Sequence, residues 1–106
     1  MIIYPNNLLP FKGFAAMNFC GVILFVRKGV VLTDRLMNHE RIHSRQIFEM
    51  LIVGFYLWYL AEWLVKLFKY QLNSYYNVSF EREAYMNDAN LEYLKERKLF
   101  AWVKLI

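Results

Sequence analysis

The segment NHERIHSRQ, residues 38–46, holds both histidines of this 106-residue chain, and the interpretation of the remaining sequence starts from it. Side chains four residues apart lie one above the other on an α-helix, so His39 and His43 would direct two imidazoles toward one point. Zinc accepts such nitrogens at about 2.0–2.1 Å. Glu40 would lie about 100° round the helix, within reach of a zinc-bound water without binding the metal itself. The segment therefore predicts a zinc site with a general base beside it.

The residues around this segment favour a helix. Thr33 and Asp34 follow an apolar stretch and are typical of an N-cap with an acidic first turn. Apolar side chains then recur at helical spacing, at Leu36, Met37, Ile42, Ile47 and Phe48. We therefore expect a helix over residues 34–50. The competing interpretation is that the two histidines and Glu40 only decorate a solvated face of that helix.

A catalytic zinc site needs a third protein ligand, and the chain has no third histidine. Cys20 lies in an apolar stretch and is better interpreted as a small buried hydrophobe. The remaining candidates are carboxylates. The best placed are Glu81 and Glu83, which follow Ser79, a residue able to cap a second helix.

Together the two segments resemble gluzincin-type zinc metallopeptidases, in which HExxH is followed by a later helix carrying E-x-x-A-D or E-x-x-A-N. The letters EREA, residues 81–84, match the first four positions of that later helix. The resemblance implies that Glu81 is the third ligand and that the small Ala84 lets its helix approach the motif helix. It also places Tyr85 where the family has an acidic or amide side chain that orients a ligating histidine.

Glu83 is the alternative third ligand. It lies about 200° from Glu81 round a helix, so the two carboxylates cannot face one metal ion. Asn87, four residues after Glu83, would then be the residue that orients a ligand. Both glutamates also have a purely structural interpretation, because acidic residues in a first turn stabilise the helix dipole. The E-x-x-A register of the family pattern favours Glu81.

Composition narrows the class of protein. Hydrophobic residues make up 58% and aromatic residues 19% of the chain, which excludes a disordered protein. The net charge of +4 comes without a basic run or a recognition motif, so we do not expect a nucleic-acid partner. The excess of positive charge is better explained by solubility, or by weak peripheral attraction to an anionic membrane face.

The chain length fits a single zincin-like domain over residues 1–106. One cysteine excludes an internal disulfide and fits a reducing compartment. The first residues lack the basic region of a signal peptide. We therefore expect the chain to be cytoplasmic or peripherally associated with a membrane.

Before the motif helix, the sequence predicts an irregular segment followed by one or two strands. Residues 1–12 contain two prolines and two asparagines and indicate an irregular lead-in. Residues 13–32 favour one or two strands, with a hairpin turn at Arg27-Lys28-Gly29. In zincins a sheet edge beside the motif helix holds the substrate as an added strand, and residues 14–26 are the candidate for that edge, although burial in the core is the simpler interpretation.

The apolar run MLIVGFYLWYLA, residues 50–61, predicts a second helix that continues almost directly from the first. With its flanks, residues 47–68, it has about the length of a membrane span. Glu49, Glu62 and Lys66 interrupt it, and each charge inside a membrane costs a few kcal/mol. We therefore favour a core or interfacial helix over a spanning one.

The remaining residues are expected to form a loop, a helix and a short tail. Residues 69–78 have the composition of a loop, residues 79–98 that of a last long helix, and residues 100–106 that of an apolar tail that docks on the core or touches a membrane. Tyr75, Tyr76 and Tyr85 are candidates to stabilise an oxyanion, although packing is the simpler role for each.

These observations predict a mainly helical α+β protein, a minimal zincin-like core with Zn²⁺ held by His39, His43 and Glu81. The predicted activity is hydrolysis of a peptide or protein substrate, with Glu40 taking the proton of the attacking water. Two alternatives remain open: a zinc-binding zincin homologue without activity, and a small membrane-associated interaction protein in which the motif is accidental.

Overall fold

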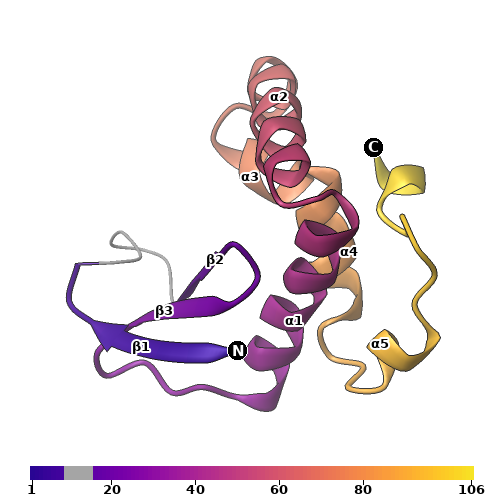
Figure 1. The fold of residues 1–106 in the computed structure, drawn as a ribbon. Coiled ribbons are helices and arrows are strands. Elements are labelled where there is room, and N and C mark those ends of the chain that lie inside the picture. Colours follow the sequence, from indigo (N-terminus) through magenta and orange to yellow (C-terminus); the bar gives the residue numbers. More distant parts are fainter. Residues whose placement is uncertain (9–15) are drawn as a thin grey trace.

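A computed structural model describes residues 1–8 and 16–106 as a small sheet set against a group of helices (Figure 1). The sheet lies beside the first helix, α1 (Asp34–Glu49). The later helices lie on the other side of α1 and beyond its C-terminal end. The expected class, α+β and mainly helical, is confirmed.

The sheet has three strands in the order β1-β3-β2: β1 (Ile2–Asn6) pairs parallel with β3 (Ile23–Arg27), and β2 (Ala16–Phe19) pairs antiparallel with it. The expectation of an irregular lead-in is therefore wrong for residues 2–6, and its residues 9–12 lie outside the described part of the chain. The sequence cue was misleading because an edge strand tolerates Pro5, whose missing N–H would be needed only in a central strand.

The hairpin turn lies at Cys20 and Gly21, not at residues 27–29. Both residues have positive φ, 55° and 81°, within the three-residue connection between the paired Phe19 and Ile23. Val22 N donates to Phe19 O at 3.2 Å and closes the turn. Two strands within residues 13–32 are confirmed for residues 16–19 and 23–27, whereas residues 13–15 lie outside the described part of the chain.

Helix α1 begins as its sequence predicts. Thr33 Oγ1 accepts a hydrogen bond from Leu36 N at 3.1 Å, and Asp34 occupies the first turn. The helix ends at Glu49, and the chain bends by 109° before α2 (Val53–Tyr70). The expectation of an almost unbroken continuation is therefore wrong. Residues 51 and 52 at the bend adopt positive φ, which breaks the helical hydrogen-bond ladder.

Helix α2 does not meet the requirement for a membrane span. Among residues 1–8 and 16–106, no single helix is both long enough and apolar enough to cross a membrane. The bent pair of Asp34–Glu49 and the helical stretch Val53–Asn87 meets the length and composition requirement only when the two are taken together.

The expected loop at residues 69–78 is mostly helical. Helix α2 continues to Tyr70, and a 3₁₀ turn, η1 (Gln71–Asn73), and a short helix, α3 (Ser74–Asn77), follow it. These short elements return the chain toward α1 and lead directly into α4 (Ser79–Asn87).

Helix α4 begins and ends differently from the prediction. Ser79 does not cap it with its own side chain; instead the Glu62 carboxylate of α2 accepts from Ser79 N at 2.7 Å and from Ser79 Oγ at 2.6 Å. The predicted helix over residues 79–98 is wrong, because α4 ends at Asn87 and only a short helix, α5 (Tyr93–Glu96), follows. Asn38 Nδ2 of α1 donates to the carbonyls of Asp88 and Asn90, and these tertiary bonds hold the turn that ends α4.

The apolar core lies where α1, α2, α4 and the chain end meet. Its buried members are Ile47, Phe55, Val78, Phe80 and Trp102. The Phe80 and Trp102 rings lie 4.6 Å apart between centroids. The tail, which includes the 3₁₀ turn η2 (Val103–Leu105), therefore docks on the core through Trp102, one of the two roles expected for it.

The buried side chain of Arg97 links the end of α1 to α4 through two ion pairs. Its Nη2 lies 2.6 Å from Glu49 Oε1, and its Nε lies 2.5 Å from Glu83 Oε2, with all three side chains buried. The two carboxylates hold the pKa of Arg97 well above its usual range even though burial opposes the charge. One guanidinium therefore serves as the counter-charge for two buried carboxylates.

Removal of Arg97 should leave Glu49 and Glu83 buried without a counter-charge. We expect Arg97→Ala to lower the free energy of unfolding by about 3–5 kcal/mol in urea denaturation. The matched control is Lys95→Ala, which breaks an exposed pair with Glu92 and should leave the unfolding curve nearly unchanged. Equal curves for Arg97→Ala and the parent chain would contradict this role.

Candidate metal centre

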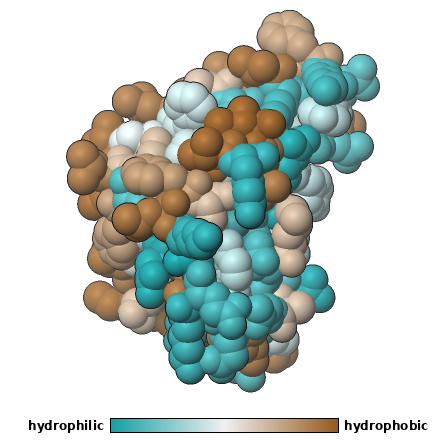
Figure 2. All heavy atoms as spheres, turned by 90° about the vertical axis from the view of Figure 1, so that its right-hand side faces the viewer, coloured by the Kyte–Doolittle hydropathy of each residue, from teal (hydrophilic) through white to brown (hydrophobic). Residues whose placement is uncertain are grey.

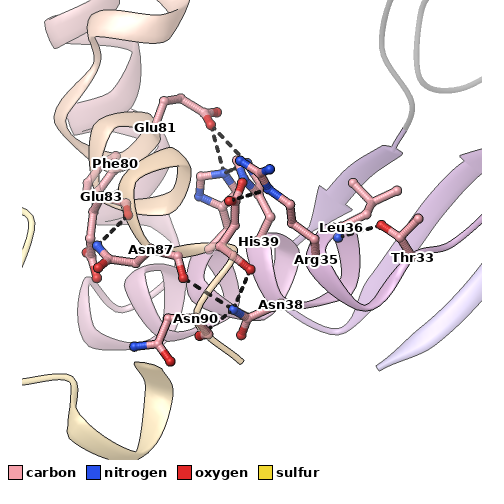
Figure 3. A network of polar contacts seen from close by, with 12 residues as sticks. Thr33, Arg35, Leu36, Asn38, His39, Phe80, Glu81, Glu83, Asn87 and Asn90 are labelled. Carbon is pink, nitrogen blue, oxygen red and sulfur yellow. Dashed lines mark hydrogen bonds and ion pairs between the residues drawn. The ribbon is translucent and has the colours of Figure 1, made fainter. Parts of the chain in front are cut away.

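Three buried side chains from α1 and α4 direct one atom each to a common point. His43 Nε2 lies 3.2 Å from His39 Nε2 and 3.0 Å from Glu81 Oε1, and His39 Nε2 lies 3.4 Å from the same Glu81 oxygen. Figure 3 shows His39 and Glu81 turned toward one another from the two helices. The helical spacing of the histidines and the position of Glu81 thus produce a group that is able to hold a metal ion.

Asp88 orients His39. His39 Nδ1 lies 3.0 Å from Asp88 Oδ2, and Arg35 Nε donates to Asp88 Oδ1 at 2.7 Å. A carboxylate accepts but does not donate, so His39 carries its proton on Nδ1 and turns the lone pair of Nε2 toward Glu81. The sequence analysis missed Asp88. Its signal was its position seven residues after Glu81, which places both carboxylates on one face of a helix.

Gln46 orients His43 in the same way. His43 Nδ1 lies 2.8 Å from Gln46 Oε1, and Gln46 Nε2 donates to Phe80 O and to Glu83 Oε1, both at 3.0 Å. These two acceptors fix the direction of the amide, so its oxygen faces the imidazole and accepts the Nδ1 proton. Gln46 was also missed, although it lies only three residues after His43 on the same helix.

Glu83 has a structural role in place of a metal-binding one. Its carboxylate accepts from Gln46, from Arg97 and from the Tyr93 hydroxyl at 2.7 Å, and it lies on the opposite side of α4 from Glu81. Asn87, proposed to orient a ligand beside Glu83, donates instead to the backbone carbonyl of Glu83 at 2.8 Å. Of the two candidate glutamates, the structure therefore brings only Glu81 to the histidines.

The protonation states of His43 and Glu81 depend on each other. Burial alone would lower the pKa of His43, but the adjacent Glu81 carboxylate raises it to about 9. Burial alone would raise the pKa of Glu81, but the two imidazoles hold it well below its usual range. Without a metal ion, a proton on His43 therefore balances the Glu81 charge.

Glu40 lies beside this group and outside it. Its side chain is buried, and burial raises the pKa of its carboxyl more than the neighbouring His43 and His39 lower it. Asn18 Nδ2 of β2 donates to the Glu40 backbone carbonyl at 2.8 Å and fixes this part of α1 against the sheet.

Two cavities flank the cluster. The first, about 270 Å³, lies on the side of His43 and Glu81 and has mostly apolar walls. The second, about 340 Å³, lies on the side of His39 and Asp88 and includes Arg35. Ala16, Glu40 and Tyr75 line both, so Glu40 faces the space on either side of the three converging atoms.

Tyr59, Tyr75 and Tyr85 lie around the cluster. Tyr75 and Tyr85 were expected from the sequence, whereas Tyr59 was not. Tyr59 Oη donates to Glu81 Oε2 at 2.9 Å, a contact that the sequence analysis missed. Burial raises the pKa of Tyr75 and of Tyr59 far above the ordinary value, so both phenols remain donors at neutral pH. Tyr85 packs edge-on against His39, with 4.6 Å between ring centroids, and its neighbour Tyr76 is more exposed.

The chain was compared with protein-family models, with curated proteins and with solved structures, and none of the three comparisons found a match. The chemistry of the site therefore rests on the geometry of its own residues.

Removal of the Asp88 carboxylate should weaken metal binding without removing a ligand. We expect Asp88→Ala to bind zinc about 10–100-fold more weakly than the parent chain, because His39 loses the acceptor that fixes its orientation. Competition with a chromophoric chelator measures this affinity. Asp34→Ala is the control, since Asp34 is exposed in the first turn of α1. Affinity in Asp88→Ala equal to that of the control would show that Asp88 does not orient His39.

Proposed function

We propose that this chain is a zinc-dependent metallopeptidase whose ligands are His39, His43 and Glu81 and whose general base is Glu40. The observation that supports the metal most directly is the spacing of the three converging atoms, 3.0–3.4 Å. Ligands bound at about 2.0–2.1 Å in a tetrahedral arrangement lie about 3.3–3.4 Å from one another. Two imidazole nitrogens and one carboxylate oxygen also form a ligand set that zinc prefers.

The number of ligands favours catalysis over a purely structural site. Structural zinc sites are closed by four protein ligands, whereas catalytic sites have three and leave one position open. In this position a bound zinc ion would supply a Lewis acid that lowers the pKa of water toward about 7. Glu40 lines both cavities and would take the proton of that water.

Glu40 would act as the general base and then as the proton donor. It takes a proton from the water that attacks the peptide carbonyl, and it then passes this proton to the departing amine nitrogen. A pKa raised by burial suits both steps, because it makes the carboxylate a stronger base and its protonated form a usable acid. Tyr75, which lines both cavities as a protonated phenol, would donate to the developing oxyanion.

Strand β2 offers a place for an extended peptide. It is an edge strand of the sheet, and its residues Ala16, Met17 and Asn18 line the first cavity beside the cluster. A substrate segment would add to this edge as a further strand and cross the site with its carbonyl facing the metal. Met17, Ile47 and Phe55 make the adjacent wall apolar, which favours a large apolar side chain next to the scissile bond.

Replacement of Glu40 by glutamine tests the mechanism, because it keeps the shape and removes the base. We expect Glu40→Gln to bind one zinc ion per chain, as the parent does, and to cleave a peptide library about 10²–10⁴-fold more slowly. Glu96→Gln, at an exposed position on α5, is the control and should cleave at the parent's rate.

Two outcomes would overturn this mechanism. Cleavage by Glu40→Gln at the parent's rate would exclude Glu40 as the base. A parent protein that binds zinc but leaves the library intact, with and without chelator, would identify a zinc-binding protein without peptidase activity.

A further inference from the structure

Helix α2 presents an apolar face to solvent along most of its length. Only Phe55 and Glu62 of its 18 residues are buried. The side chains that point away from the protein form the outer face of α2, made of Val53, Leu57, Leu60, Leu64, Val65 and Phe68, all exposed. Phe68 is 90% exposed. An ordinary surface helix shows the reverse arrangement, with its apolar side chains toward the core.

Two of the three charged residues of α2, Glu62 and Lys66, point inward. Glu62 is buried, where it caps α4 through Ser79 and accepts from Lys66 Nζ at 2.7 Å. Lys66 also donates to the carbonyl of Asn77. Glu62 and Lys66, the two charges that interrupt the apolar run within α2, therefore have partners inside the protein. The residues that make up the outer face of α2 are all uncharged.

The apolar surface continues beyond both ends of α2. Leu51, at the bend before the helix, is 84% exposed, and Leu72, just after it, is 96% exposed. Phe48 of α1, also exposed, lies against Gly21 in the β2–β3 turn. In Figure 2 brown atoms gather along the left side and near the top, whereas teal atoms cover the lower front and much of the upper right. Contiguous apolar surface of this kind marks an interaction site.

Exposed basic residues precede and follow the apolar stretch of α2 along the chain. Arg41 and Arg45 are exposed on the side of α1 that leads to Phe48, since residues 41, 45 and 48 follow helical spacing. Lys69 is exposed at the far end, next to Phe68. All 9 acidic residues lie in the described part of the chain, and the exposed ones, Asp34, Glu92 and Glu96, lie at the start of α1 and around α5.

We propose that the outer face of α2 lies in the surface of an anionic lipid bilayer, with Arg41, Arg45 and Lys69 at the level of the headgroups. An apolar helix face flanked by basic side chains gains both from burial among acyl chains and from attraction to anionic lipids. A second copy of the chain fits less well. In a two-fold pairing of this face, the basic residues at its ends would meet basic residues, whereas lipid phosphates neutralise them.

This surface is independent of the metal centre, because no residue of the outer face of α2 belongs to the cluster or lines its cavities. Its test therefore stands whether or not the chain hydrolyses peptides.

Flotation with lipid vesicles tests the proposal on the full chain. We expect the parent protein to float with vesicles of phosphatidylcholine mixed with phosphatidylserine, and to float several-fold less with phosphatidylcholine alone. The double variant Leu57→Glu with Phe68→Glu should lower partitioning at least about tenfold, since two large apolar groups no longer enter the bilayer. Val31→Glu is the control: Val31 is 78% exposed, but it lies before α1, at the opposite end of that helix from α2.

A second double variant tests the contribution of the basic residues separately from that of the apolar face. Arg41→Glu with Arg45→Glu keeps the apolar face and should remove the preference for anionic over neutral vesicles. Circular dichroism and thermal unfolding of each variant show that it is folded.

Three results would overturn the proposal. The first is a parent protein that floats with neither vesicle. The second is a Leu57→Glu, Phe68→Glu protein that is folded and floats as the parent does. The third is a parent protein that is dimeric without lipid, does not float, and becomes monomeric in that variant, which would assign the face to a second copy of the chain.

Discussion

Three buried acceptor atoms, on His39, His43 and Glu81, converge at distances of 3.0–3.4 Å, and most of the polar structure serves to hold them there. Lone pairs packed this closely in a buried site need a cation between them, either a proton or a metal ion. The proton on His43 provides that cation in the metal-free chain, and a divalent ion would replace it with a stronger attraction.

The polar contacts around the cluster hold α1 and α4 in the required register. Asp88 and Arg35 fix His39 from one side, while Gln46 and Glu83 fix His43 from the other. Arg97 then joins Glu83 to the end of α1, so the chain of contacts closes between the two helices.

Burying so many polar groups in a small core lowers the apolar contribution to stability, yet the side chains that orient the two histidines, Asp88 and Gln46, each have further partners. This arrangement is the one expected when a site, and not stability alone, determines which residues occupy the contact between two helices.

Local geometry explains which parts of this structure the sequence predicted. The cap at Thr33, the course of α1 and the shared face of His39 and His43 depend on residues within a few positions of one another. The contacts that the sequence did not predict are mostly long-range. Strand β1 forms by pairing with β3, and α4 ends where Asn38, some 50 positions earlier, binds its last carbonyls.

The residue that orients His39 was also not predicted by the sequence pattern. The family pattern drew attention to Tyr85, four positions after Glu81, because a carboxylate or amide is usual there. In this chain Asp88 contacts His39 from one turn further on, and Tyr85 packs against the imidazole instead. Asp88 keeps helical backbone directly after Asn87, the last residue of α4, and therefore lies on the same face of that helix as Glu81.

The inverted helix α2 places the site and the apolar surface on different sides of one small protein. Tyr59, on the inner side of α2, donates to Glu81, while the outer face of α2 is left for another partner. The helix that carries the exposed apolar surface thus also contacts the His39, His43 and Glu81 group, which could hold a metal ion.

The central claim is that His39, His43 and Glu81 bind one metal ion together. The most direct measurement is a crystal structure of the zinc-loaded chain with anomalous scattering recorded at the zinc edge. The account predicts one anomalous peak, at about 2.0–2.2 Å from His39 Nε2, His43 Nε2 and a Glu81 oxygen. The absence of a peak between these atoms, or a peak bound by Glu83 or by the Nδ1 atoms, would contradict it.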